Sequence, residues 1–330
     1  MKTRVLFMGT AEIAVPSLQA LLRHESVELV AVVTQPDRPQ GRKLQLKPSA
    51  VKAAALAAEL PVLQPERVRT ADSLDQVRGL KPDLIVVMAY GQILPQSLLE
   101  IPRFECLNLH TSVLPKYRGA APIQWALLNG DVETGVTLMR MDAGMDTGPI
   151  IDIRRTVITP EDTGESLYQR LSELAAQLLI ESLPGWLSGT LLAMPQPTEG
   201  ACHARKVEKL DGWLDWTLPS RVLANKVRGL VPWPGAFFYR GGVERAVIKV
   251  WESRPETGTF GGEPGEVLSA DCGGVVVRCG EGALRVLSLQ REGGKRLGVR
   301  EFLAGNPMAR GEKLPNVSLA TSGEDSLNAR

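Results

Sequence analysis

The chain has 330 residues, of which 44% are hydrophobic, and its 38 basic and 37 acidic side chains give a net charge of +1. This length predicts about two domains, and the nearly cancelled charge gives no global sign of a nucleic acid or a membrane as partner. The four cysteines form no CxxC pair and there are only three histidines, so a structural zinc site is not expected.

Neither a leader peptide nor a membrane span is expected. The opening MKTRVLFMGT reaches a glycine after a short apolar run, and no stretch of about 18 apolar residues occurs. We therefore expect a soluble, cytoplasmic protein with reduced thiols.

Short apolar runs alternate with helical patterns in the first half of the chain. The run Leu84–Ala89 (LIVVMA) is apolar throughout, as in a strand buried on both faces. This alternation predicts an α/β domain over residues 1–189, with a doubly wound, mostly parallel Rossmann-like sheet. The predicted strands are Val5–Met8, Leu29–Thr34, Leu84–Ala89, Cys106–His110 and Val136–Met141, and the predicted helices are Ser17–Arg23, Ala50–Glu59 and Leu167–Leu187.

The second half changes character after a linker expected at residues 190–205. Short strands separated by glycine turns follow one helix, which predicts a smaller OB-like β-barrel over 206–314, with a sandwich as the alternative. Residues 315–330 are polar and are expected to be a disordered tail. The predicted elements here are the helix Pro219–Leu230 and the strands Ala236–Tyr239, Ala246–Val250, Gly265–Leu268, Gly274–Cys279 and Leu284–Leu289.

Basic side chains concentrate in two places. Residues 205–314 carry 18 basic and 13 acidic side chains, whereas residues 1–204 carry 19 and 22, so a polyanion can contact the C-terminal half. The polar stretch 34–52 (TQPDRPQGRKLQLKPSAVK) holds five basic residues and one acid. Loops of this length are usually functional, and this one could contact phosphates and wedge against bases. A solvated loop and ordinary scatter of surface charge are the alternatives.

Asn108 and His110 lie two residues apart at the end of a predicted strand, so their side chains project to the same side. Ligands bind at such strand ends in open α/β sheets, and an amide beside an imidazole suits a carbonyl oxygen that takes up negative charge. Local hydrogen bonding at a polar strand end is the alternative.

A carboxylate could complete this pair. The stretch MRMDAGMDTGPI holds Asp142 and Asp146, and either could orient the imidazole and accept a proton from an attacking nucleophile, although turn chemistry alone would also explain them. Gly9 also follows a predicted strand, but GTAEIAVP lacks the further glycines of a dinucleotide fingerprint. A nicotinamide oxidoreductase is therefore not expected.

Several motifs together resemble the formyltransferases that use 10-formyltetrahydrofolate, and within them the members that act on methionyl-tRNA. The resemblance covers roughly residues 3–305 and leaves out the tail. It implies a monomeric enzyme that needs no metal and transfers the formyl group to the α-amino group of methionyl initiator tRNA. The motifs are FMGTAEIAVPSLQAL, TQPDRPQGRKLQLKPSAVK, VVMAYGQILP, NLHTSVLPKYRGAAPIQWALLNG, MDAGMDTGPI, LDWTLPS and VRGLVPWPGAFF.

The same resemblance implies roles for individual residues. Asn108 and His110 would donate hydrogen bonds to the formyl oxygen, and Asp146 would orient His110 and help to remove the proton of the attacking amine. The folate would lie against Met88, Ala89, Tyr90, Gly91, Ser112, Val113, Leu114 and Pro115. The tRNA would meet Arg38, Arg42, Lys43, Lys47, Lys206, Lys209, Lys226 and Arg228.

Two other functions remain open from the sequence. A sugar-nucleotide or other small-amine formyltransferase of the same family would share the three catalytic residues but would have little use for a cationic loop at 34–52. A non-catalytic RNA-binding protein would bind tRNA in a salt-sensitive way without formyl transfer.

Overall fold

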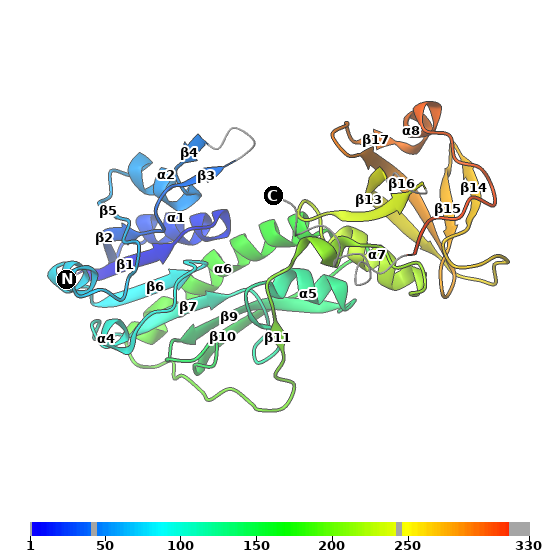
Figure 1. Ribbon diagram of the computed structural model, residues 1–330. Helices are drawn as coiled ribbons and strands as arrows, with labels where there is room; N and C mark the ends of the chain where they lie inside the picture. The colour runs from blue at the N-terminus through cyan, green and yellow to red at the C-terminus, as the bar shows by residue number, and fades with distance from the viewer. Residues whose placement is uncertain (1, 41–44, 242–245, 317–330) are drawn as a thin grey trace, which may run out of the picture. The chain divides into compact units, whose positions relative to one another are not determined.

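The computed structural model describes residues 2–40, 45–241 and 246–316, and the chain divides into two compact units (Figure 1). The segment expected to be a linker, 190–205, belongs to the first of them. The N-terminal unit comprises Met1–Ala126, Val132–Pro160 and Ser166–Lys206, and the C-terminal unit comprises Leu127–Asp131, Glu161–Glu165 and Val207–Arg330.

The N-terminal unit is built on a seven-stranded sheet in which five neighbouring strands are parallel to one another, and the last two strands at one end each pair antiparallel with the strand before them. The mostly parallel, Rossmann-like sheet predicted from the sequence is confirmed. In spatial order the strands are β10 (Ile150–Val157), β9 (Glu133–Arg140), β7 (Cys106–His110), β6 (Leu84–Met88), β1 (Thr3–Gly9), β2 (Val27–Val33) and β5 (Val62–Leu63).

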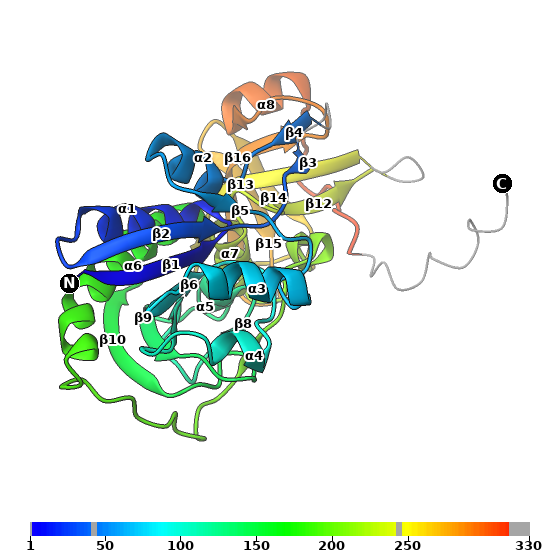
Figure 2. The same ribbon diagram turned by 90° about the vertical axis from the view of Figure 1, so that its left-hand side faces the viewer.

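Helices cover both faces of this sheet (Figure 2). Leu6 and Met8 of β1 share one buried cluster with residues of α3 and α4, and the alternating Val5 and Phe7 are equally buried because successive strand residues face opposite sides. The helices are α1 (Val15–Arg23), α2 (Ala50–Ala57), α3 (Ala71–Gly79), α4 (Gln96–Leu99), α5 (Pro122–Leu128) and α6 (Gly164–Leu187).

The polar stretch 34–52 contains a short hairpin of β3 (Arg38–Gln40) and β4 (Gln45–Lys47), where the sequence predicted only a loop. Its base is held by Asp37, which accepts hydrogen bonds from Lys52 Nζ at 2.6 Å and from Gln64 Nε2 at 2.8 Å. The bond from Lys52 holds the pKa of Asp37 below its ordinary value. The hairpin therefore starts from a fixed point on α2.

The C-terminal unit is an antiparallel β-rich domain, as predicted. Trp216 and Phe238 meet edge to face in its core, with ring centroids 5.6 Å apart. Among the described residues no pairing joins β12 to β14, so closure into a barrel stays a prediction. The strand order is β12 (Ala236–Arg240), β13 (Ala246–Glu256), β16 (Ala283–Arg291), β15 (Gly274–Arg278) and β14 (Val267–Asp271), with β17 (Leu297–Gly298) beside β16, and the helices are α7 (Ser220–Gly229) and α8 (Val299–Gly305).

The predicted disordered tail begins with an ordered residue. Asn316 Oδ1 accepts from the backbone N–H of Trp216 at 3.2 Å, and its amide nitrogen donates to Asp215 at 2.9 Å. Residues 317–330 of this prediction lie outside the described residues. In the part of the chain that the structure describes, no helix is long and apolar enough to cross a membrane.

Candidate active site

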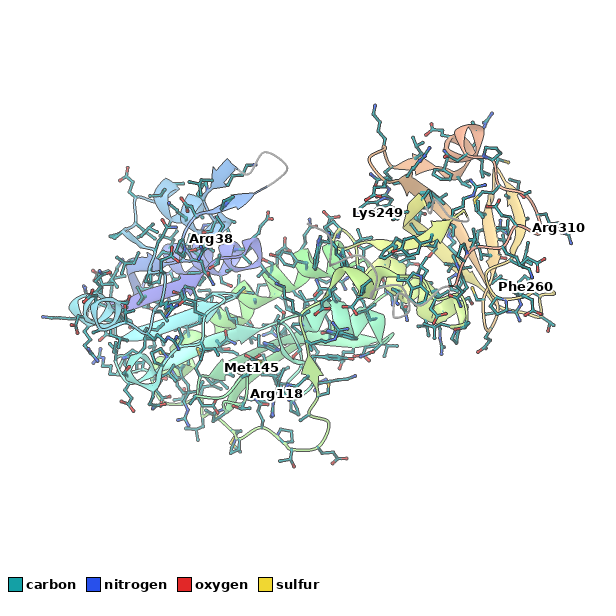
Figure 3. All side chains as sticks on the ribbon, viewed as in Figure 1. Arg38, Arg118, Met145, Lys249, Phe260 and Arg310 are labelled. Carbon is teal, nitrogen blue, oxygen red and sulfur yellow. The ribbon has the colours of Figure 1, made fainter. Side chains whose placement is uncertain are left out.

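A cavity of about 570 Å³ lies where β6 and β7 end, a size typical of small-molecule sites. Much of its lining is apolar, and Met145, 59% exposed, stands on the loop at its rim (Figure 3). Three separate segments form most of the wall, which are 87–94, 108–111 and 141–146.

Asn108 reaches this cavity from the middle of the sheet. It pairs with Val87 of β6 on one side and with Met139 of β9 on the other. The residue is only 9% exposed and lines the cavity, and its side-chain amide has no hydrogen-bond partner within residues 2–40, 45–241 and 246–316. A nearly buried amide of this kind suits a ligand oxygen.

His110 makes a hydrogen bond through one ring nitrogen and has a carboxylate beside the other. Nε2 lies 2.9 Å from the carbonyl oxygen of Tyr117, and because a carbonyl can only accept, the proton is assigned to Nε2. Nδ1 lies 3.6 Å from Asp146 Oδ2. Only Nδ1 therefore remains to face a ligand, and it can donate an N–H there when the ring is doubly protonated.

Asp146, of the two aspartates left open by the sequence, is the one beside His110. Its Oδ2 accepts a hydrogen bond from the backbone N–H of Gly119 at 2.8 Å, and its own backbone is left-handed, with φ 54°, which aspartate tolerates better than most residues. Asp142 instead accepts from Thr147 Oγ1 and from the Gly144 N–H at 2.8 and 3.0 Å, which closes the turn of the loop.

The turn after β7 presents the Tyr117 carbonyl to His110. Thr137 Oγ1, on the buried side of β9, accepts from the Leu114 N–H at 3.1 Å and donates to the Ser112 carbonyl at 2.7 Å. Ser112 Oγ donates to the Lys116 carbonyl at 2.7 Å. These residues shape the turn rather than the cavity wall.

The structure brings half of the residues predicted for folate to the cavity. Met88, Ala89, Tyr90 and Gly91 line it, whereas Ser112, Val113, Leu114 and Pro115 do not, and Thr111 takes their place. Sequence reasoning missed Gln92, Ile93, Leu94, Met139 and Ala143–Met145. For Met145 the available signal was an apolar residue in the polar, glycine-rich stretch MDAGMDTGPI. In the structure its side chain is 59% exposed.

The basic residues predicted for tRNA fall into three groups. Arg38, Lys47, Lys206 and Lys209 are exposed, and Arg38 pairs with Glu66 at 3.1 Å. Lys226 Nζ donates to the Trp213 carbonyl at 2.8 Å, with its pKa lowered by burial, and Arg228 donates to Asn225 and to the Asp162 carbonyl at 3.0 and 3.2 Å. Arg42 and Lys43 lie outside the described residues.

Comparison with known proteins identifies the family. The profile described as formyl transferase matches residues 1–183, and that of the formyl transferase C-terminal domain matches residues 206–307. The chain belongs to the formyl transferase family. Formyl transferases with high similarity include methionyl-tRNA formyltransferases of Geobacter sulfurreducens, 48% identical over 94% of this chain and 96% of that protein, and of Myxococcus xanthus, 46% identical over 94% and 98%.

Solved structures share the fold at lower identity. An N-formyltransferase from Helicobacter canadensis, in complex with folinic acid and dTDP-3-aminofucose, superposes with a TM-score of 0.66 at 19% identity, covering 88% of this chain and 100% of that one. HypX from Aquifex aeolicus in complex with tetrahydrofolic acid gives a TM-score of 0.58 at 20% identity, covering 96% and 51%. At these identities the likeness concerns the fold alone.

Gly148 makes the Asp146 loop possible, because a Cβ there would lie 1.8 Å from the Arg140 carbonyl oxygen. We expect Gly148→Ala to force the loop outward and to destabilise the protein by about 1–3 kcal/mol, measured as a lower midpoint of thermal unfolding. Gly79→Ala is the control, since nothing lies within 4 Å of its Cβ on α3 and alanine favours a helix. Equal midpoints for Gly148→Ala and the wild type would contradict this packing.

Proposed function

We propose that the chain transfers the formyl group of 10-formyltetrahydrofolate to the α-amino group of methionyl initiator tRNA, giving formylmethionyl-tRNA for translation initiation. The observation that carries this proposal is the meeting of Asn108, His110 and Asp146 at one cavity. Relatives with the corresponding name are 48% and 46% identical over 94% of the chain. The proposal places the reaction in the cytoplasm, on a monomer.

The cavity suits the proposed cosubstrate in size and chemistry. Its wall combines the backbone of Met88–Gly91 with the apolar side chains of Ile93 and Met145, a combination that can flank a flat ring and read its polar edge. When bound, 10-formyltetrahydrofolate would supply a formyl group on a nitrogen leaving group. The remaining chemistry belongs to groups of the chain itself.

Asn108 and His110 would stabilise the formyl oxygen as it gains negative charge. The side-chain amide of Asn108 donates one hydrogen bond, and His110 donates the second from Nδ1, because Nε2 is committed to the Tyr117 carbonyl. Donors fixed before the reaction need no rearrangement while charge develops, which is why such sites lower the barrier.

Asp146 would accept the proton that the attacking amine must lose. An ammonium group cannot attack, so its proton must leave first, and Asp146 Oδ2 stands 3.6 Å from His110 Nδ1 at the same cavity. The carboxylate offers an acceptor for the amine proton. The Gly119 N–H holds that oxygen in place.

The direct test is an assay with the purified chain, 10-formyltetrahydrofolate and charged initiator tRNA, read by mass spectrometry of the released amino acid. Formylmethionine is the expected product, with charged elongator tRNA as the poorer substrate. A parallel reaction with a dTDP-aminosugar in place of the tRNA tests the alternative suggested by the Helicobacter canadensis structure. Formylation of the sugar alone, or of neither amine, would refute the proposal.

Substitution of Asn108 or Asp146 should lower kcat far more than substitution of a surface residue. We expect Asn108→Ala and Asp146→Ala each to lower kcat at least about a hundredfold, because each removes a group that acts on the reacting atoms. Asp75→Ala is the matched control, since Asp75 is exposed on α3 and forms a surface ion pair with Arg78 at 2.8 Å. Near-normal turnover in either active-site variant would contradict the assignment.

The tRNA is proposed to contact the basic stretch 34–52 and the C-terminal domain. The exposed Arg38, Lys47, Lys206 and Lys209 are better placed for phosphates than Lys226 and Arg228, whose donors already hold groups of the C-terminal unit.

Arg42→Ala should raise the KM for methionyl-tRNA and leave the Kd of a folate analogue unchanged, because one phosphate contact is lost. The slope of the logarithm of the tRNA binding constant against the logarithm of the salt concentration should become shallower by about one, because one fewer counterion is released. Arg23→Ala, an exposed arginine at the end of α1, is the control and should change neither. The same tRNA kinetics in Arg42→Ala and wild type would argue against this contact.

A further inference from the structure

A strap formed by residues 194–204 runs between the two segments that match the family profiles, 1–183 and 206–307. At its start, Met194 and Ile150 exchange two backbone hydrogen bonds of 2.7 Å. At its end, β11 (His203–Ala204) pairs in parallel with β8 (Arg118–Gly119). The strap is thus fastened to the rest of the N-terminal unit at both of its ends.

Gln196, in the middle of the strap, uses the full hydrogen-bonding capacity of its amide. Its Nε2 donates to the carbonyl oxygens of Asp146 and Gly148, both at 2.8 Å. Its Oε1 accepts from Arg118 Nε at 3.1 Å and from Arg118 Nη2 at 2.7 Å. One amide therefore joins the loop that carries Asp146 to the side chain of Arg118.

Arg118 stands between the two backbone groups that hold the catalytic side chains. The preceding residue, Tyr117, gives its carbonyl to His110 Nε2 at 2.9 Å, and the following residue, Gly119, gives its N–H to Asp146 Oδ2 at 2.8 Å. Arg118 itself donates its backbone N–H to the Cys202 carbonyl of the strap at 2.9 Å. A shift of Arg118 would move both contacts together.

The Asp146 loop depends on such outside support. Asp146 has a left-handed backbone and Thr147 beside it is exposed, so few packing contacts hold the loop in place. The loop's own bonds, from Thr147 and Gly144 to Asp142, close its turn but do not fix its distance from β7. The Gln196 amide ties the backbone of the loop, in addition to the bond from the Gly119 N–H to the Asp146 side chain.

We propose that Gln196 is a positioning residue for formyl transfer, which, with Arg118, sets the distance between the His110 imidazole and the Asp146 carboxylate. Its kinetic consequence rests on the proposed function, whereas its structural consequence does not. Gln196 touches no reacting atom, so it acts through the placement of two groups that do.

Gln196→Leu keeps the approximate size of the side chain and removes all four hydrogen bonds. We expect kcat for formyl transfer to fall about 10- to 100-fold, with the KM values for methionyl-tRNA and folate changed less than about threefold because the cavity wall remains. Gln96→Leu is the matched control: Gln96 is exposed on α4, and its side chain donates to Glu100 at 2.8 Å. Wild-type kcat in Gln196→Leu would overturn the proposal.

A double-mutant cycle separates positioning from loss of stability. In an Asp146→Asn background the carboxylate is already gone, so adding Gln196→Leu should lower the remaining single-turnover rate by less than about twofold. Gln196→Glu, which keeps acceptors for Arg118 but loses the donors to both carbonyls, should resemble Gln196→Leu. The same rate loss in the Asp146→Asn and wild-type backgrounds would indicate a merely structural role and overturn the proposal.

The ring nitrogen signals of His110 in the unliganded protein give a readout that needs no substrate. They can be assigned by NMR through their disappearance in His110→Gln. We expect these signals to shift in Gln196→Leu and to stay unchanged in Gln96→Leu. If the wild type formylates no methionyl-tRNA, the proposed function fails while this comparison still decides the role of Gln196. Unchanged His110 signals in Gln196→Leu would overturn that role.

Discussion

The rest of the site depends on the placement of the His110 imidazole. Its ring lies between the Tyr117 carbonyl, at 2.9 Å, and the Asp146 carboxylate, at 3.6 Å. The carbonyl fixes the proton on Nε2 and so leaves Nδ1 as the working atom. The Asp146 carboxylate lies beside that atom, where it can orient the ring. With Asn108 beside it, this ring turns a strand end into a place where a carbonyl oxygen can gain negative charge.

The mixed topology of the sheet is what brings the carboxylate to the ring. The Met141 N–H donates to the Cys106 carbonyl at 2.8 Å, so the loop after β9 begins beside the start of β7, yet Asp146 lies next to His110 at the other end of that strand. The loop must therefore fold back along β7. A purely parallel sheet, in which a crossover helix would follow the strand, would not provide this return path.

The sequence predicted what local periodicity controls and missed what distant contacts control. Spacing alone placed Asn108 and His110 on one side of β7, whose bounds are as predicted. Strand β10 was missed because its later residues, such as Arg154 and Arg155, are polar on an edge strand. Ser112 and Leu114 were predicted to contact folate. Their backbone groups bond to Thr137, 25 and 23 residues away, and neither residue lines the cavity. Gln196 lies 50 residues from Asp146, and no motif or spacing around it in the sequence indicates that the two residues meet.

The central claim is tested most directly by a crystal structure of the chain with a stable 10-formyl folate analogue bound. The account predicts the formyl oxygen within hydrogen-bonding distance, about 2.7–3.2 Å, of both the Asn108 amide and His110 Nδ1, with the Asp146 carboxylate still beside the ring. A formyl group bound elsewhere in the cavity, or Asp146 turned away from His110 in that complex, would contradict it.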